Sequence, residues 1–258
     1  MKLTFLGTGT SMGVPTISCR CRTCRSTDPR DKRLRCSALV ELDSGKNILI
    51  DCGPDFRAQM LALDSPAIES VLVTHTHYDH LGGIDDLRPY CYVAPDSHFP
   101  VYCRADVARD LRNRVPYCFA EHPYRGVPTF TIHEIKEGDR FIPKGTDTEV
   151  LAIPVIHGTL HILGFRIGSL AYITDCSVLP EEAYPMLEDL DTLVINALRI
   201  KPHPTHMSLQ ESLATIERIK PARAFLTHIS HDMGLHEEVS KLLPPNVKIA
   251  VDGMKIVI

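Results

Sequence analysis

The sequence has no long apolar segment. None of the hydrophobic runs in its 258 residues approaches the ~18 residues that a membrane-spanning helix requires. The first residues, MKLTFLGTGTSMG, lack the extended apolar stretch and the cleavage site of a signal peptide, and they predict a short strand that enters a glycine turn. We therefore expect a cytoplasmic protein with no membrane partner.

An excess of positive charge is absent as well. The formal net charge is -4 at pH 7, which argues against a protein that coats nucleic acid or lies on anionic lipid. One stretch is an exception, because between Arg20 and Arg35 seven basic residues face only Asp28 and Asp31, a local charge of +5 (7 minus 2). Two interpretations of this stretch stay open: a solvated loop, or a surface that attracts a phosphate-bearing substrate.

The chain contains no linker, no low-complexity segment and no glycine pattern typical of nucleotide-binding loops. Hydrophobic residues make up 44% and charged residues 23%, as in ordinary globular proteins, and the length suits one layered domain over residues 1–258. GTGTSMG near the N-terminus matches neither the dinucleotide fingerprint nor the P-loop. A turn at the end of a strand is the favoured interpretation, and substrate contact is the alternative.

Short strands alternate with helical segments along the chain. Strands are predicted at 2–7, 37–43, 46–51, 69–74, 129–135, 149–156, 164–168, 170–175, 192–197 and 222–227. Helices are predicted at 54–63, 105–115, 180–190, 207–220 and 235–243. Ser208 and Glu211 form a capping-box pattern, Ser44-Gly45 predicts a hairpin turn, and residues 247–258 predict a terminal hairpin that turns at Asp252-Gly253. Residues 90–147 are proline-rich and give few other signals.

One pattern occurs twice. SVLVTHTHYDH (residues 70–80) and AFLTHISHDM (residues 224–233) each run from a buried strand into a Thr-His pair. Strands and helices in two similar halves predict an α/β fold in which two mixed sheets pack face to face with helices outside, an αββα sandwich.

The strongest chemical signal is THTHYDH, which places His75, His77, Asp79 and His80 within six positions. On a loop that leaves a strand, His75 with His77 can bind one metal ion while Asp79 with His80 binds a neighbouring ion. His157, Asp175 and His228 each follow a later predicted strand, and an aspartate between two cations can bridge them. These residues together predict a metal centre.

Nine cysteines in a cytoplasmic chain do not indicate a disulfide framework. Six are scattered and are interpreted as small buried side chains. The other three, Cys19, Cys21 and Cys24, form the cluster CRCRTC, and soft sulfur ligands at this spacing suit tetrahedral zinc. A closed zinc site takes four ligands, so the cluster lacks one.

The sequence has the pattern HxHxDH after a strand, and single His, Asp and His residues each end a later strand. This arrangement resembles the metallo-β-lactamase superfamily of hydrolases. Within it, LGTGTSMGVPTISCRCRTC, THTHYDH, LTHISH and the closing DGM are similar to the PhnP-type phosphodiesterases of the carbon–phosphorus lyase pathway, which act on cyclic ribose phosphates. The resemblance covers essentially the whole chain, except that residues 90–147 carry no motif that aligns.

The resemblance implies a role for each of these residues. One divalent metal ion, Zn²⁺ or Mn²⁺, would bind His75, His77 and His157, and a second would bind Asp79, His80 and His228, with Asp175 as the bridge and Asp51 behind the ligands. A structural Zn²⁺ would bind Cys19, Cys21, Cys24 and His231 in a cysteine loop at about residues 19–36. Cys36 is the alternative fourth ligand of that site.

The implied activity is hydrolysis of a small cyclic phosphodiester by a hydroxide that two cations generate at neutral pH. Asp79 belongs to this catalytic centre, and His206 is the candidate proton donor for the leaving alkoxide, although it could equally be a solvent-exposed loop residue. Two other functions stay open: a tRNA-processing endonuclease-like hydrolase, and a non-catalytic metal-binding or assembly protein of cofactor biosynthesis. Nothing clearly supplies an RNA-binding arm, so nucleic acid is not expected, and the sequence is compatible with a homodimer.

Overall fold

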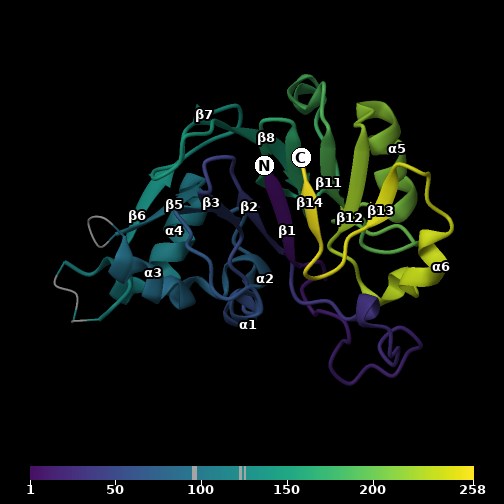
Figure 1. The fold of residues 1–258 in the computed structure, drawn as a ribbon, viewed down its shortest axis with the longest axis horizontal. Helices are drawn as coiled ribbons and strands as arrows, with labels where there is room; N and C mark the ends of the chain where they lie inside the picture. The colour runs from purple at the N-terminus through teal and green to yellow at the C-terminus, as the bar shows by residue number, and fades with distance from the viewer. Residues whose placement is uncertain (95–97, 122–123, 125) are drawn as a thin grey trace.

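The structure is a computed structural model that describes residues 1–94, 98–121, 124 and 126–258. Two mixed sheets, each of seven strands, form its centre. The first sheet has the order β14-β1-β2-β3-β4-β5-β6 and the second β13-β12-β11-β10-β9-β8-β7. The two sheets pack face to face and carry helices on their outer surfaces (Figure 1). The predicted αββα sandwich is thereby confirmed.

The strands have the following bounds. The first sheet contains β1 (Lys2–Gly7), β2 (Ser37–Glu41), β3 (Asn47–Ile50), β4 (Ser70–Leu72), β5 (Phe99–Cys103), β6 (Phe130–Glu134) and β14 (Lys255–Val257). The second contains β7 (Arg140–Phe141), β8 (Val150–His157), β9 (Leu160–Ile167), β10 (Leu170–Ile173), β11 (Thr192–Asn196), β12 (Arg223–Thr227) and β13 (Val247–Ile249).

The α-helices are α1 (Phe56–Leu61), α2 (Tyr78–Leu81), α3 (Arg88–Val93), α4 (Ala105–Arg114), α5 (Leu209–Ile219) and α6 (His236–Ser240). Short 3-10 helices are η1 (Pro29–Asp31), η2 (Ile84–Leu87), η3 (Pro116–Phe119), η4 (Glu181–Leu187) and η5 (His231–Met233). Helices α1, α3 and α4 pack against the first sheet, and α5 and α6 pack against the second. Within the described residues, no helix is both long and apolar enough to cross a membrane.

Burial on both faces explains why the strands are apolar at nearly every position. In β10, Leu170 and Tyr172 face the other sheet, whereas Ala171 and Ile173 face the helices. Successive side chains of a strand point to opposite faces, so a strand that is covered on both sides needs apolar residues throughout. The Phe5 and Phe225 rings, 5.8 Å apart, join the two sheets at their interface.

Parallel pairing brings several strand ends to the same edge of the sandwich. Strands β3 to β6 run parallel to one another, as do β10 to β13. In such sheets the carboxyl ends of the strands lie together, and the loops that follow them commonly form the ligand site. The two Thr-His segments follow β4 and β12, so both belong to this edge.

The structure confirms most of the predicted elements. The hairpin that joins β2 and β3 turns at Gly45 with a φ of 78°, and Ser208 caps α5 through the predicted box with Glu211. Segment 180–190, predicted as an α-helix, forms the 3-10 helix η4, with Pro185 inside it. Strands β5 and β7 lie in the region 90–147, which contains few local signals of secondary structure.

The predicted terminal hairpin is wrong. A turn does occur at Asp252-Gly253, but β13 pairs with β12 in the second sheet and β14 pairs with β1 in the first. The Asp252 carboxylate accepts hydrogen bonds from the Thr8 hydroxyl at 2.7 Å and from the Leu34 backbone N–H at 2.6 Å. These bonds hold the turn against the chain that leaves β1, so the last strand crosses to the other sheet instead of folding back.

Candidate metal centre

Seven histidine and aspartate side chains from both sheets meet at the edge where the strands end. His75, His77, Asp79 and His80 follow β4, His157 ends β8, Asp175 follows β10 and His228 follows β12. Their ligand atoms form two adjacent groups, and the atoms within each group lie within 4.8 Å of one another. These are the two groups that the family resemblance implied.

His75, His77 and His157 form the first group. The ring centroids of His77 and His157 lie 5.0 Å apart. His157 Nδ1 lies 2.7 Å from the Thr205 carbonyl oxygen, which can only accept a hydrogen bond, so Nδ1 carries the proton and Nε2 has a free lone pair. Burial lowers the pKa of His75 well below its usual value, which keeps this imidazole in the neutral form that binds metals.

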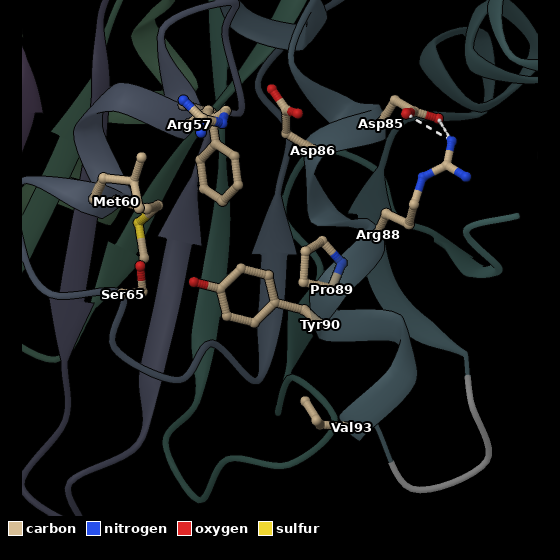
Figure 2. A pocket seen from close by; sticks show the side chains of 11 residues that line it. Arg57, Met60, Ser65, Asp85, Asp86, Arg88, Pro89, Tyr90 and Val93 are labelled. Atoms are coloured by element: carbon tan, nitrogen blue, oxygen red, sulfur yellow. Dashed lines mark hydrogen bonds and ion pairs between the residues drawn. The ribbon is translucent and has the colours of Figure 1, made fainter. Parts of the chain in front are cut away.

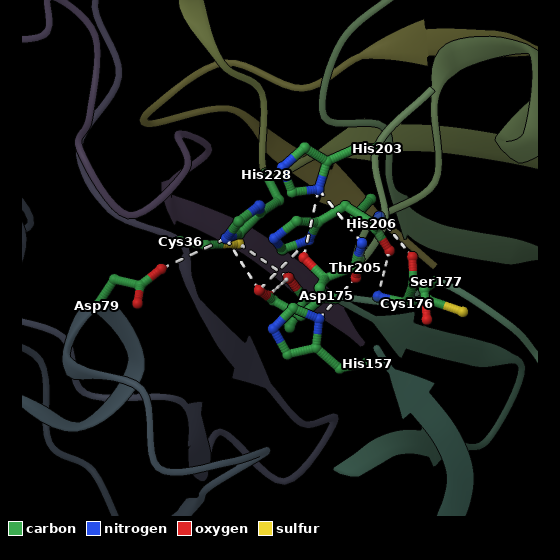
Figure 3. Close-up of polar contacts among 12 residues, drawn as sticks. Cys36, Asp79, His157, Asp175, Cys176, Ser177, His203, Thr205, His206 and His228 are labelled. Atoms are coloured by element: carbon green, nitrogen blue, oxygen red, sulfur yellow. Dashed lines mark hydrogen bonds and ion pairs between the residues drawn. The ribbon is translucent and has the colours of Figure 1, made fainter. Parts of the chain in front are cut away.

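Asp79, His80, Asp175 and His228 form the second group. His80 Nε2 lies 3.2 Å from Asp79 Oδ2 and 3.1 Å from Asp175 Oδ2. His228 Nε2 lies 3.4 Å from Asp79 Oδ2 and 3.2 Å from Asp175 Oδ1. Asp175 Oδ1 is also 4.0 Å from Nε2 of His75 in the first group, so this carboxylate lies between the two groups (Asp175 in Figure 3).

Buried carboxylates make the second group strongly attractive to a cation. Burial alone would lower the pKa of His80, but Asp175, Asp79 and Asp51 together raise it well above its usual value. Burial would likewise raise the pKa of the Asp175 carboxyl, but His228 and His80 hold it well below its usual range. The group thus keeps its carboxylates ionised and takes up a proton, and a divalent cation can replace that proton.

Two buried nitrogens provide a direct test of whether the residues fit a metal. Nε2 of His75 and Nε2 of His80 are both inaccessible to solvent: the first has no hydrogen-bond partner in the described part of the chain, and the second faces only the Asp79 and Asp175 carboxylates. Leaving a buried polar group without a partner costs about 1–3 kcal/mol. Coordination of a cation would satisfy both atoms, so the donor set fits a metal.

Asp51 and Thr74 hold the ligands from behind. Asp51 is fully buried, and its Oδ2 lies 2.7 Å from His80 Nδ1. Its Oδ1 accepts a hydrogen bond from the Thr74 backbone N–H at 2.8 Å. Thr74 Oγ1 lies 2.9 Å from Asp51 Oδ2 and 3.0 Å from His75 Nδ1. Such contacts fix the tautomer and orientation of metal-binding histidines, and here they reach one histidine of each group.

Three residues of the centre have left-handed backbone conformations. Asp51, Asp175 and His228 have φ angles of 61°, 55° and 56°. This conformation is unfavourable for residues with a side chain and persists where the surrounding structure enforces it, frequently at functional sites. Each of the three comes directly after a strand or one residue later, so the turn aims the side chain into the centre.

A cavity of about 300 Å³ opens onto both groups. Besides the ligands, its walls contain Ser11, Thr159, Leu160, Thr205 and His206, and no lysine or arginine of the described chain lines it. The His206 ring centroid lies 4.6 Å from that of His157, and its Nδ1 lies 3.6 Å from Asp175 Oδ1 (Figure 3). His206 therefore belongs to the cavity and is not a solvent-exposed loop residue.

A second cavity, of about 460 Å³, lies among α1, η2 and α3 on the outer side of the first sheet (Figure 2). Phe56, Met60 and Tyr90 give it apolar walls, and Arg57 and Asp86 also border it. It contains no histidine or cysteine and none of the seven ligand residues, so it is separate from the metal centre.

The cysteine cluster forms a third group of ligand atoms. Cys19 Sγ and Cys21 Sγ lie 3.5 and 3.3 Å from His231 Nδ1, and Cys24 Sγ is within 4.8 Å of the others. A hydrogen bond from the Cys24 backbone N–H, with help from His231, lowers the pKa of Cys21 to about 6, whereas burial raises that of Cys24 to about 11. Three sulfurs and one imidazole nitrogen match a tetrahedral zinc site, and zinc would hold all three thiols ionised.

Cys36, the alternative fourth ligand, lies elsewhere. It is fully buried in the core between the two sheets, with its Sγ 3.1 Å from the Tyr172 hydroxyl. The geometry therefore favours His231 as the fourth member of the cysteine group.

Several basic residues between Arg20 and Arg35 bind this loop to other parts of the chain through ion pairs and hydrogen bonds. Arg22 forms an ion pair with Glu238 of α6 at 2.8 Å, and Arg35 forms one with Asp55 at 3.1 Å. Arg33 is buried and donates a hydrogen bond to the Ala250 carbonyl oxygen at 2.7 Å. No residue of the stretch lines the cavity at the metal centre, which supports a structural loop over a phosphate-attracting surface.

Sequence reasoning missed the polar residues that support the ligands. Thr74, Thr174 and Thr227 come directly before His75, Asp175 and His228, and all three threonines are fully buried. The repeated order of threonine and then ligand was a visible signal. Thr205, which acts through its backbone carbonyl, gave no signal, because any residue supplies a carbonyl oxygen.

Residues 46–229 match the family model described as the beta-lactamase superfamily domain. A solved structure described as a new diphosphatase from the PhnP family superposes with a TM-score of 0.91 and 41% identity, covering 99% of this chain and 96% of that one. The anti-Pycsar protein Apyc1 of Bacillus phage 010DV004 is 34% identical over 251 residues, 90% of each chain.

A protein of Porphyromonas gingivalis named octanoyltransferase is 40% identical over 259 residues. The match covers all of this chain but only 52% of that protein. The family match spans more than half of the chain, and the sandwich carries the histidine and aspartate groups at the expected strand ends. The chain therefore belongs to the β-lactamase superfamily and has the fold of its metal-binding hydrolases.

Proposed function

We propose that this protein hydrolyses small phosphodiesters of the ribose cyclic phosphate type, using two divalent cations in the histidine and aspartate groups. The observation that carries the proposal is the position of Asp175 between two ligand groups that open onto one cavity. The hydrolase fold and the similarity to a PhnP-family diphosphatase support a hydrolytic reaction at phosphorus.

In this proposal His75, His77 and His157 would hold one cation, and Asp79, His80 and His228 would hold the other. Asp175 would help to hold both, and Zn²⁺ and Mn²⁺ both suit such ligands. Bound cations would neutralise charge on the phosphate and lower the pKa of a water molecule toward neutrality. A structural Zn²⁺ in the cysteine group would hold the loop of residues 19–36.

The chain's own residues supply the orientation. Asp51 keeps the Nδ1 proton of His80 directed away from the centre, and Thr205 does the same for His157. Both imidazoles therefore present Nε2 toward the cations. Since no lysine or arginine of the described residues lines the cavity, the hydroxyls of Ser11, Thr159 and Thr205 are the hydroxyl donors that its walls offer to phosphate oxygens.

His206 would donate the proton that the leaving alkoxide needs. Burial and the neighbouring His228 lower the pKa of His206 to about 3, so the imidazole of the free protein is neutral at pH 7. A bound phosphate anion would raise this pKa, since nearby negative charge favours the protonated form. His206 would then carry its proton only while substrate fills the cavity.

The dimensions of the cavity favour a small substrate. At about 300 Å³ it is near the lower limit of ligand pockets, which run from roughly 300 to 1,000 Å³. A cyclic ribose phosphate suits such a volume, whereas a folded RNA would need a wider positive surface.

Hydrolysis of a diphosphate is the second candidate, and the PhnP-family diphosphatase favours it. The same ligand groups suit both reactions. The leaving groups differ, because a phosphate that leaves an anhydride needs no proton donor, whereas an alkoxide does.

A substrate panel would test the proposal. Protein loaded with Mn²⁺ or Zn²⁺ is assayed with bis(p-nitrophenyl) phosphate, a ribose cyclic phosphate, a nucleoside diphosphate, a phosphomonoester, a tRNA precursor, a β-lactam and an octanoyl thioester. We expect the diesters to have the highest kcat/KM and chelation to abolish turnover. Preference for the diphosphate would establish the second candidate. Turnover of only the lactam or the thioester would refute both.

A further inference from the structure

Four fully buried side chains form a polar group beneath the metal centre: Cys36 of the chain before β2, Tyr172 of β10, Thr174 and Thr227. Cys36 Sγ lies 3.1 Å from the Tyr172 hydroxyl, 3.3 Å from Thr227 Oγ1 and 3.7 Å from Thr174 Oγ1. Cys36 is not among the described residues that line the cavity, and Figure 3 draws it together with Asp175 and His228. This group lies in the core between the two sheets, which is otherwise mostly apolar.

Each threonine of the group comes directly before a ligand of the centre. Thr174 Oγ1 lies 2.7 Å from Asp175 Oδ2, and Thr227 is joined through the backbone to His228. The hydroxyls of Tyr172 and Thr227 have no hydrogen-bond partner other than Cys36 in the described part of the chain. The Cys36 sulfur is therefore the shared partner of Thr174, which contacts Asp175, and of Thr227, which precedes His228 in the chain.

The hydrogen atoms can be assigned consistently. Thr174 has one hydroxyl proton, and the short contact to the Asp175 carboxylate is stronger than a contact to sulfur, so Thr174 donates to Asp175. The Tyr172 and Thr227 hydroxyls can then donate to the two lone pairs of Cys36. The thiol proton is left to donate to Thr174 Oγ1, and each polar atom of the group has a partner.

We propose that Cys36 is a positioning residue for the metal centre, which fixes Asp175 and His228 through Thr174 and Thr227. The proposal rests on the metal-dependent function proposed for that centre, and it assigns a role to a cysteine that the sequence suggested only as a small buried side chain or as the alternative fourth ligand of the cysteine group. The neutral thiol suits this role, because it accepts from two hydroxyls and donates to a third without placing another charge beside the carboxylates.

Removal of the sulfur should disturb the ligands in a specific way. In Cys36→Ala the Tyr172 and Thr227 hydroxyls lose their partner, and the Thr174 hydroxyl that contacts Asp175 loses its neighbouring sulfur. Rearrangement of these hydroxyls would change the direction of the Asp175 carboxylate. Cys36→Ser keeps one donor and two lone pairs at the same place, so it should restore most of the arrangement.

Cys103 provides a matched control. It is fully buried like Cys36, but it lies at the end of β5 in the core between the first sheet and its helices, and its thiol has no hydrogen-bond partner in the described chain. Cys103→Ala therefore creates the same small cavity without touching the polar group. Thr174→Val, which removes only the last link to Asp175, is a second probe in case Cys36→Ala does not fold.

The test is a calorimetric titration of Mn²⁺ into full-length protein that keeps its zinc in the cysteine group, with a melting curve for each variant. We expect Cys36→Ala and Thr174→Val to weaken Mn²⁺ binding by about 10-fold or more, the usual effect of losing a residue that supports a ligand. Cys36→Ser should bind within a few-fold of the unmodified protein. Cys103→Ala should lower the melting temperature and leave the Mn²⁺ affinity unchanged.

The outcomes separate this inference from the proposed function. If the unmodified protein binds neither Mn²⁺ nor Zn²⁺ at the centre, the proposed function fails. If it binds Mn²⁺ and Cys36→Ala binds equally tightly while melting like Cys103→Ala, the centre stands and the positioning role of Cys36 is refuted. A loss of affinity in Cys36→Ser as large as in Cys36→Ala would also refute it, since the role would then depend on sulfur volume and not on hydrogen bonds.

Discussion

Replacement of His231 with alanine tests the two histidines of LTHISH, which lie three residues apart but belong to different ligand groups. His228 contacts Asp79 and Asp175, whereas His231 Nδ1 lies beside Cys19 and Cys21. His231 is the only member of the cysteine group that comes from outside residues 19–24. Its loss would separate the cysteine loop from the segment after β12 while leaving the histidine and aspartate groups intact.

The expected effect is large enough to measure. Structural zinc contributes ~10–16 kcal/mol of apparent binding in small zinc domains, so one ligand of four accounts for roughly 3–4 kcal/mol. At about 2–4 °C per kcal/mol for a chain of this size, the melting temperature should fall by about 6–16 °C. Backbone hydrogen bonds between Thr10 and Ile229 and between Ile229 and Thr8 remain, so the segment should stay in place at low temperature.

The assay compares metal content, melting temperature and residual diesterase activity. His231→Ala should lose zinc and stability but keep activity in the cold, whereas His228→Ala should keep the zinc of the cysteine group and lose activity. His161→Ala, an exposed histidine outside all the ligand groups, serves as the control. Unchanged zinc content and melting temperature in His231→Ala would show that this histidine does not belong to the cysteine group.

Three further predictions follow from the contacts of single residues. Asp79→Ala and Asp175→Ala should each lower kcat/KM for a diester by several orders of magnitude, and activity close to that of the unmodified protein would contradict their place in the centre. His206→Ala should slow a diester with a poor alkoxide leaving group by about 10²–10⁴ but affect a p-nitrophenolate ester much less, and equal losses would instead indicate a role in substrate positioning. Ser208→Ala removes the cap of α5 and should cost about 1 kcal/mol in urea unfolding with kcat unchanged, whereas a much smaller cost would mean that the box contributes little.

The candidate metal ligands could be predicted from the sequence because each ends or follows a strand of recognisable composition. Buried strands such as β4 and β12 are continuous apolar runs, and a histidine directly after such a run stands out. The pairing of His75 with His157, 82 positions apart (157 minus 75), could not come from these local signals. It came from the resemblance to a family, and the fold then supplied the geometry.

Other features depend on long-range contacts that leave no local pattern. Asp252-Gly253 is a turn by composition, but the bonds of Asp252 to Thr8 and Leu34 decide which sheet receives the last strand. Strand β5 contains Pro100 and is short, so its composition did not distinguish it from a loop. The contacts of Cys36 with Tyr172, Thr174 and Thr227 join residues far apart in the sequence, so the sequence suggested only packing or zinc binding for this cysteine.

The position of the cations is the most direct test of the central claim. Crystals of the protein loaded with Zn²⁺ would be measured above and below the zinc absorption edge, and the anomalous difference map would be calculated at the metal centre. The account predicts one peak among His75, His77 and His157, a second among Asp79, His80 and His228, and Asp175 in contact with both. Zinc in the cysteine group with no peak at the histidine and aspartate groups would contradict it.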